Sequence, residues 1–288
     1  MVGLIGIVII FVTVFGGYII AGGKIGIILA SLPYEMLMIG GAAIGAFVIS
    51  NDVAAIKQTM KDLGKVFKGP KWKHKDYKDL LCLLFELIRI ARSNPVALEE
   101  HIENPKDSSI FGKYPRIQAD KEGVALICDT LRSATMNYDD PHQVEEVLEK
   151  RIEAYGHHTM HSTHALQSIA DGLPALGIVA AVLGVIKTMG SIDQPPEILG
   201  GMIGGALVGT FLGVFLAYGF FAPFAAKLTT VLLEDAHFYK LIREVLVANL
   251  HQHAPNICIE VGRQNTPGHN RPSFTELEEA LKATKDAA

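Results

Sequence analysis

Charged residues are scarce in this 288-residue sequence. They make up 19% of the chain, whereas hydrophobic residues make up 49%, and this balance is unusual for a soluble domain. Residues 1–51 contain a single basic residue, Lys24. The composition therefore favours a membrane protein, while the small net charge of −4 says little about partners.

Cysteine is scarce as well, since the chain has only Cys82, Cys128 and Cys258, in no motif spacing. Their spacing argues against a disulfide framework and indicates a reducing compartment. The sequence also has no nucleotide-binding glycine loop and no motif around a nucleophile. It therefore gives no support to an enzyme or to a bound cofactor.

One row of histidines has helical spacing. His157, His161 and His164 lie four and three residues apart, so they could form a metal-binding face. No cysteine lies near them in the sequence, and a histidine-rich helix beside a membrane is usually a solvated, weakly basic surface. We favour the solvated surface and expect no metal.

Long uncharged runs occur four times. Residues 2–21 would cover about 30 Å as a helix, which is one hydrocarbon core, and they lack the basic start and the cleavage site of a signal peptide. We expect further spans at about 33–51, 169–190 and 198–226, with Pro33 in a first helical turn. The last run is longer than one bilayer requires, so that span should tilt or extend beyond the membrane.

The distribution of lysine and arginine predicts the orientation of the spans. Lys57, Lys61, Lys65 and Lys68 follow the second span, whereas the loop 191–199 contains acidic residues but no basic ones. Positive charge marks the cytoplasmic side. We therefore expect a multi-pass protein of the bacterial inner membrane with both termini in the cytoplasm.

The expected fold is all-α, and the apolar residues of the polar segments recur at helical spacing. Transmembrane helices 1 and 2 are expected in residues 1–51, and a cytoplasmic helical domain in residues 52–168. Transmembrane helices 3 and 4 are expected in residues 169–226. A cytoplasmic helical extension and tail should then follow in residues 227–288.

Glycines in the fourth span form a regular row. Gly201, Gly205, Gly209 and Gly213 are four residues apart, so they share one helix face on which another backbone can approach closely. The row could pack within the chain, as in many membrane bundles. Its length favours packing against a different protein or a second copy.

Ionisable groups are missing from the middle of the predicted spans. Glu35, Asp171 and Lys187 fall near span ends, where they can reach water, and the polar residues at depth include Thr210 and Tyr218. A proton pathway usually needs an ionisable group within the membrane. If the chain serves ion flow, a partner should supply the titrating carboxylate.

Two prolines interrupt the last two spans. Pro174 and Pro223 are expected near the cytoplasmic ends and therefore at one depth, where each would leave a bendable point. For Pro174, simple helix initiation after Asp171 is an equally weighted alternative. That alternative explains Pro223 poorly, because the apolar pattern continues through it.

Charged residues of the polar segments suggest two surfaces. The lysines of residues 57–78 could meet anionic lipid headgroups, which we favour over nucleic acid. Arg89, Arg92 and Glu99 could form an electrostatic docking surface for a protein partner, although a solvated charged face is the commoner outcome.

Five separated motifs resemble one known family, in order and over nearly the whole chain. The sequence is similar to the MotA-type stator subunits of the flagellar motor, within the MotA/TolQ/ExbB proton channel family. The matching segments are VTVFGGYIIAGG (12–23), IENPKDSSIFGKYPRI (102–117), DGLPALGIVAAVLGVIKTMGS (171–191), GALVGTFLGVFLAYGFFAPFA (205–225) and RPSFTELEEAL (271–281). The ExbB/TolQ energisers of outer-membrane processes are the alternative, but they have three spans rather than four. A stand-alone channel is a third hypothesis, which the lack of a membrane acid disfavours.

The resemblance implies a function and partners. Such subunits form a ring, thought to be a pentamer, around the single membrane helices of MotB-like partners that carry the proton-accepting aspartate. Proton flow then turns the ring, and the cytoplasmic part acts on the rotor protein FliG. The resemblance implies no cofactor.

The resemblance also implies roles for particular residues. Pro174 and Pro223 would couple proton flow to motion. Thr210 would face the partner's aspartate with Tyr218 nearby, and Ala181 stands where sodium-driven relatives have a hydroxyl, which favours protons. Glu99 would face the rotor together with an arginine, Arg92 in preference to Arg89.

Overall fold

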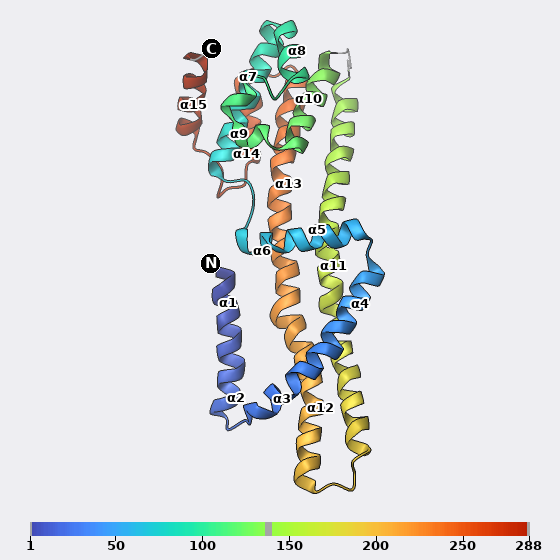
Figure 1. Ribbon diagram of the computed structural model, residues 1–288. Coiled ribbons are helices and arrows are strands. Elements are labelled where there is room, and N and C mark those ends of the chain that lie inside the picture. Colours follow the sequence, from blue (N-terminus) through green and yellow to red (C-terminus); the bar gives the residue numbers. More distant parts are fainter. Residues whose placement is uncertain (1, 136–139, 287–288) are drawn as a thin grey trace. The chain divides into compact units, whose positions relative to one another are not determined.

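The structure, a computed structural model, describes residues 2–135 and 140–286, and all regular secondary structure in them is helical (Figure 1). The expected all-α class is therefore confirmed. In chain order the elements are α1 (Val2–Phe11), η1 (Val12–Gly16), α2 (Gly17–Ile20), α3 (Ile25–Glu35), η2 (Met36–Gly40), α4 (Gly41–Ser50), α5 (Val53–Leu63), α6 (Lys65–Lys68), α7 (His74–Ser93), α8 (Pro95–Glu103), η3 (Phe111–Lys113), α9 (Pro115–Gln118), α10 (Lys121–Thr135), α11 (Pro141–Met189), α12 (Pro196–Leu216), η4 (Ala217–Phe221), α13 (Ala222–Leu250), α14 (Pro255–Asn265) and α15 (Phe274–Asp286).

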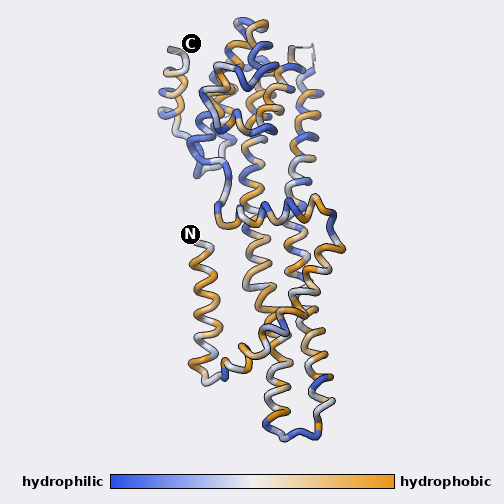
Figure 2. Tube along the Cα trace, in the orientation of Figure 1, coloured by the Kyte–Doolittle hydropathy of each residue, from blue (hydrophilic) through white to orange (hydrophobic). Residues whose placement is uncertain are grey.

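These helices form two compact units. The first, which we call the membrane unit, comprises residues 1–69 and 159–231, and the second, the polar unit, comprises 70–158 and 232–288. The long helices α11 and α13 contribute residues to both. Figure 2 shows that hydrophobic residues dominate the helices of the membrane unit, whereas hydrophilic residues are interspersed along those of the polar unit.

Four helical segments are long and apolar enough to cross a membrane, as the sequence predicts. They are Gly3–Ile20, Ile25–Ser50, and parts of the longer helical segments Pro141–Met189 and Pro196–Leu250. The second begins earlier than expected. Gly22, at φ 82°, closes the turn after α2, and the helix starts again at Ile25.

The early start of the second span moves Pro33 from a first helical turn to the interior of α3. A proline there lacks one backbone donor and crowds the preceding turn. A π-helical turn, η2, follows at Met36–Gly40. The expectation that Pro33 begins a helix is therefore wrong, because the uncharged residues before it are already helical.

Pro174 likewise lies inside a helix. Since α11 begins at Pro141, helix initiation does not explain Pro174. Asp171, expected as a possible cap, instead accepts a hydrogen bond from the Gln167 side chain at 2.8 Å. Pro223 follows the π-helical turn η4, a wider turn that makes room for the proline ring.

The core of the polar unit surrounds α7, whose residues Leu80–Ile88 are nearly all fully buried. The Trp72 ring stacks on Phe238 with centroids 3.8 Å apart. Glu86, buried on α7, accepts hydrogen bonds from Lys113 at 2.6 Å and Tyr114 at 2.8 Å. The charged Lys113 and the neutral Tyr114 hydroxyl together offset the cost of burying the carboxylate.

The cysteines lie free and buried in this core. Burial raises the pKa of the Cys82 and Cys128 thiols to about 12, so both remain protonated at neutral pH. They act as small hydrophobic side chains.

Candidate functional site

The α11 and α12 helices of the membrane unit meet along a seam of small residues. A Cβ atom added to Gly213 would lie 2.6 Å from the Leu173 carbonyl oxygen and 2.8 Å from the Gly177 Cα atom. A Cβ added to Gly184 would lie 2.6 Å from the Ala206 Cβ. The two backbones therefore touch where side chains are absent, which is how helices associate in lipid.

The four-residue glycine row of α12 packs mainly within the chain. A Cβ on Gly205 would lie 3.0 Å from the Ser31 hydroxyl oxygen of α3, and Gly209 faces both α3 and α11. For Gly201, by contrast, no described atom beyond its chain neighbours and the adjacent backbone of its own helix lies within 4 Å of an added Cβ. The expectation that the row packs against a different protein or a second copy is therefore wrong for Gly205, Gly209 and Gly213, which face helices of this chain.

Glu35 is the acid that the sequence-based interpretation misplaced. It is only 5% exposed, and its Oε2 atom lies 2.6 Å from the position of a Cβ on Gly209. Among the described residues, this Oε2 has no hydrogen-bond partner. A carboxylate that we expected at the interface is thus enclosed by the helices of the membrane unit.

The early start of α3 explains this burial. Ten uncharged residues separate Lys24 from Glu35, and all ten belong to the helix, so that Glu35 is its eleventh residue. A hydrophobic window extended back to Ile25 would have placed Glu35 inside the span. The sequence predicts a later start, at Pro33, because proline is common in the first turn of a helix.

A cavity of about 630 Å³ adjoins Glu35. Its polar lining comes from Ser31, Tyr34 and Glu35 of the second span and from Lys187 and Thr188 near the end of α11. Thr188 is buried, and its hydroxyl donates a hydrogen bond to the Gly184 carbonyl at 2.9 Å. This cavity is therefore lined by both an acid, Glu35, and a base, Lys187.

Ala181 and Thr210 both lie near Gly209 of α12. The Ala181 backbone nitrogen is 3.2 Å from the position of a Cβ on Gly209, next to Thr210 in the chain. Thr210 and Ala181 are both half-buried, whereas Tyr218, in the π-helical turn η4, is 69% exposed. The structure thus places Ala181 beside Gly209, the chain neighbour of Thr210, and leaves Tyr218 exposed on its helix.

The two prolines of the last spans lie at different levels. Contacts of Leu173 with Gly213 and of Gly184 with Ala206 fix the antiparallel register. Pro174 is therefore level with about Phe215, and Pro223 lies eight residues further along, which is about 12 Å at 1.5 Å per residue. The expectation of a common depth is wrong, because the seam places Pro174 further into the bundle.

The rotor-facing candidates lie at the junction of α7 and α8. Asn94 ends α7 and caps α8, and Pro95 occupies the first turn of α8. Arg89 and Arg92 are in the last turns of α7, and Glu99 is exposed on α8. The first helical stretch of the polar unit is therefore two helices, with charges on both sides of the break.

Arg92 is fixed by the polar unit itself. Its guanidinium donates hydrogen bonds to the Asn249 side-chain oxygen at 2.8 and 3.2 Å and to the His253 carbonyl. The turn after α13 also contains Gln252 at φ 62°. Arg92 thus holds this turn in place while its own side chain stays exposed.

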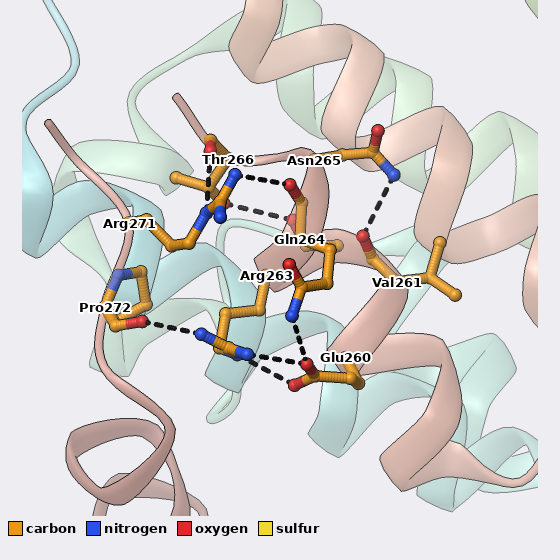
Figure 3. Close-up of polar contacts among 9 residues, drawn as sticks. Glu260, Val261, Arg263, Gln264, Asn265, Thr266, Arg271 and Pro272 are labelled. Carbon is orange, nitrogen blue, oxygen red and sulfur yellow. Dashed lines mark hydrogen bonds and ion pairs between the residues drawn. The ribbon is translucent and has the colours of Figure 1, made fainter. Parts of the chain in front are cut away.

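The RPSF motif (271–274) takes part in hydrogen bonds that stabilise the link between α14 and α15 (Figure 3). Arg263 donates to both carboxylate oxygens of Glu260, at 2.6 and 2.8 Å, and to the Pro272 carbonyl. Arg271 donates to the Gln264 and Thr266 carbonyls. This motif of the sequence therefore has a structural role in the polar unit.

The lysines after the second span lie on the short helices α5 and α6. Lys57, Lys61 and Lys68 are exposed. On the covered side of α5, Asp62 is fully buried and accepts a hydrogen bond from Ser162 of α11 at 2.9 Å. This bond anchors α5 to α11 and leaves the lysines facing outward.

Comparisons with known proteins give one result along the whole chain. Residues 4–95 match the model of the motility protein A N-terminal region, and residues 120–239 match that of the MotA/TolQ/ExbB proton channel family. Motility protein A of Salmonella typhimurium is 40% identical over 287 residues, 99% of this chain and 97% of the relative. Chemotaxis protein LafT of Vibrio parahaemolyticus is 36% identical over 278 residues, 96% and 97% of the two chains.

Two solved structures share the fold. The MotAB structure of C. jejuni superposes with a TM-score of 0.74 at 21% identity, covering 94% of this chain and 98% of that one. The flagellar MotAB stator complex of Bacillus subtilis gives a TM-score of 0.68 at 24% identity, covering 89% and 92%. With the family matches and the 40% identity, they lead to one conclusion: the chain belongs to the MotA proteins, the flagellar stator subunits of the MotA/TolQ/ExbB proton channel family.

Proposed function

We propose that this stator subunit conducts protons together with a MotB-like single-span partner and converts their flow into torque. Several copies, five by the family resemblance, surround the membrane helices of that partner. The polar unit acts on the rotor protein FliG. The protein is a channel-family subunit and not an enzyme.

The exposed face of the last two spans carries this proposal. Large apolar side chains stand outward on α11 and α12, although these helices are already packed on each other along the seam. They include Ile178, Val182, Leu207 and Val214, with Tyr218 in the following turn. An uncharged face with a few hydroxyl groups suits a partner helix that brings its own carboxylate.

Charge on the remaining surfaces supports the orientation and the other contacts. The exposed lysines of α5 and α6 suit the anionic headgroups of the inner leaflet of the bacterial inner membrane, and this supports an orientation with both termini in the cytoplasm. Glu99 and the Arg89–Arg92 turn present charges of both signs to FliG. Nucleic acid and cofactors have no place in this arrangement.

The family match of the N-terminal region favours a stator over an ExbB/TolQ-like energiser. The motility-specific N-terminal model covers residues 4–95, which include the first two spans. Ala181 at the position of a hydroxyl in sodium-driven relatives favours protons over sodium.

Complementation tests the proposal directly. The chain, produced with its own MotB-like partner in a bacterium that lacks stator units, should restore swimming in sodium-free medium. The purified complex should contain about five copies of this chain for two of the partner when its mass is measured. Failure to bind any single-span partner, together with failure to restore swimming, would contradict the proposed function.

A further inference from the structure

Three potential metal ligands come together in the polar unit. His142 and Glu145 are in the first turns of α11, three residues apart, and His251 follows the end of α13. One ligand atom from each of the three lies within 4.8 Å of those of the others. This is a different set of residues from the His157 row that the sequence suggested.

The spacing of these groups allows a small ion to bind all three. His142 Nδ1 and Glu145 Oε2 are 3.9 Å apart, and the His142 and His251 rings have centroids 5.4 Å apart. Tetrahedral zinc at about 2.0–2.1 Å from its ligands holds them roughly 3.3 Å apart. Side-chain rotations that move the ligand atoms by up to about 1.5 Å close the difference from the present spacing, and they meet little resistance because His142 is 79% exposed.

The ligand types select the class of metal. Two imidazoles and one carboxylate suit zinc and neighbouring transition metals, whereas calcium and magnesium prefer oxygen ligands alone. Three protein ligands leave a fourth position for water. We propose that His142, Glu145 and His251 bind one zinc-class divalent ion per chain.

Binding would join two parts of the polar unit that are distant in the sequence. The ion would connect the start of α11 to the turn after α13. In that turn His251 lies between the two residues that accept hydrogen bonds from Arg92, which are Asn249 through its side chain and His253 through its carbonyl. The ion would therefore restrain the turn on which Arg92 rests. Under the proposed function this turn belongs to the rotor-facing region, but metal binding itself does not depend on that function.

Metal titration of the purified full-length chain tests the site. The protein is solubilised in detergent, freed of its affinity tag and of metal, and titrated with Zn²⁺ by calorimetry. We expect saturation at one equivalent per chain and no competition from excess Mg²⁺. His142→Ala and His251→Ala should each weaken Zn²⁺ binding at least about tenfold, since even the loss of groups that only orient a ligand costs 10–100-fold.

A matched control is available on the same helix. His157 is also exposed on α11, and His157→Ala should leave the affinity for Zn²⁺ unchanged. Helix content by circular dichroism should be the same in all variants. Hydrogen exchange in residues 249–253 should slow on addition of Zn²⁺ to the unaltered chain and not to the His251→Ala variant.

Three outcomes would overturn the site. Binding could remain undiminished in both His142→Ala and His251→Ala, could fall to the same extent in His157→Ala, or could rise without saturation near one equivalent. Each of these is independent of swimming, so failure of the metal site leaves the proposed stator function untouched.

Discussion

Glu35 of the second span directly faces Gly209 of the fourth. The Glu35 Oε2 atom occupies space 2.6 Å from where a Cβ on Gly209 would stand, and the Ala180 Cβ is 3.2 Å from the same point. The carboxyl group therefore fits because residue 209 has no side chain. A row of small residues on α12 thus serves two purposes, since it brings α11 close and makes room for a buried acid.

Glu35→Gln should raise the melting temperature of the purified protein or leave it unchanged. An ionised carboxylate with an unpartnered buried oxygen costs several kcal/mol of desolvation, and the amide has nearly the same shape without the charge. Thermal unfolding in detergent measures the effect. Glu197→Gln, at an exposed position in the first turn of α12, is the matched control. A clear loss of stability in Glu35→Gln alone would indicate that the carboxyl group is stabilised by a partner.

Gly213→Ala should destabilise the membrane unit by about 1–3 kcal/mol, the usual cost of overpacking. Its Cβ would overlap the Leu173 carbonyl and the Gly177 backbone, neither of which can move aside as a flexible side chain would. The melting temperature and the yield of intact complex should both fall. Gly201→Ala should have little effect on either, because among the described atoms outside its own helix none lies within 4 Å of the new methyl group. Equal sensitivity at the two positions would mean that Gly201 is packed against another chain.

The number of spans and the all-α class were predictable because apolar runs of this length are characteristic of membrane-spanning helices. The start of the second span was not, since Pro33 is a strong local signal that the long apolar stretch before it overrides. The wrong expectation that Glu35 lies at the membrane interface follows from that one error. The sequence also predicted a glycine face on α12 without identifying its neighbour, because periodicity gives the face of a helix and not the element that covers it.

The cluster of His142, Glu145 and His251 shows a second reason why sequence reasoning stops short. The first two residues have helical spacing, but the third is more than 100 positions away and comes near them only through the packing of α11 against α13. Arg92 is similar, since its partners at the end of α13 and in the turn after it could not be predicted from its own segment.

Pro174→Ala and Pro223→Ala should leave insertion and assembly intact and abolish or strongly impair swimming. Alanine restores the backbone donor that proline lacks and stiffens each helix at its interruption. Swimming speed and complex yield are measured together. Pro196→Ala, at the start of α12, is the control, because a first-turn proline removes no hydrogen bond within the helix. Normal swimming in both interior variants would rule out a role for these prolines in coupling.

Because Pro174 and Pro223 lie about two turns apart along the bundle, their effects need not be equal. The half-buried Pro174 adjoins the seam with α12, whereas Pro223 is exposed. The yield of complex in the Pro174→Ala/Pro223→Ala double variant should therefore fall by no more than the sum of the two single effects.

Glu99→Lys should weaken engagement with the rotor without loss of folding. Glu99 is exposed on α8, and surface charges steer association more than they stabilise a fold. Recruitment of fluorescently labelled stator units to the motor should fall severalfold, while the amount of complex in the membrane stays the same. Glu146→Lys, exposed on α11, should leave recruitment unchanged. Unaltered recruitment in Glu99→Lys would remove this residue from the docking surface.

Loss of the Glu260–Arg263 pair should destabilise the polar unit in a pH-dependent way. The Arg263 guanidinium, which donates two hydrogen bonds to the carboxylate, holds the pKa of Glu260 below its usual value. A lowered folded-state pKa contributes stability above the unfolded pKa, and this contribution is lost as pH falls through the folded value. Glu260→Gln should therefore lower the melting temperature at pH 7, and the difference from the unaltered protein should shrink below about pH 4. Glu278→Gln, on α15 outside this network, should show no such convergence. A difference that stays constant with pH would mean that the hydrogen bonds to Gln264 and Pro272, rather than the charge on Glu260, hold the link between α14 and α15.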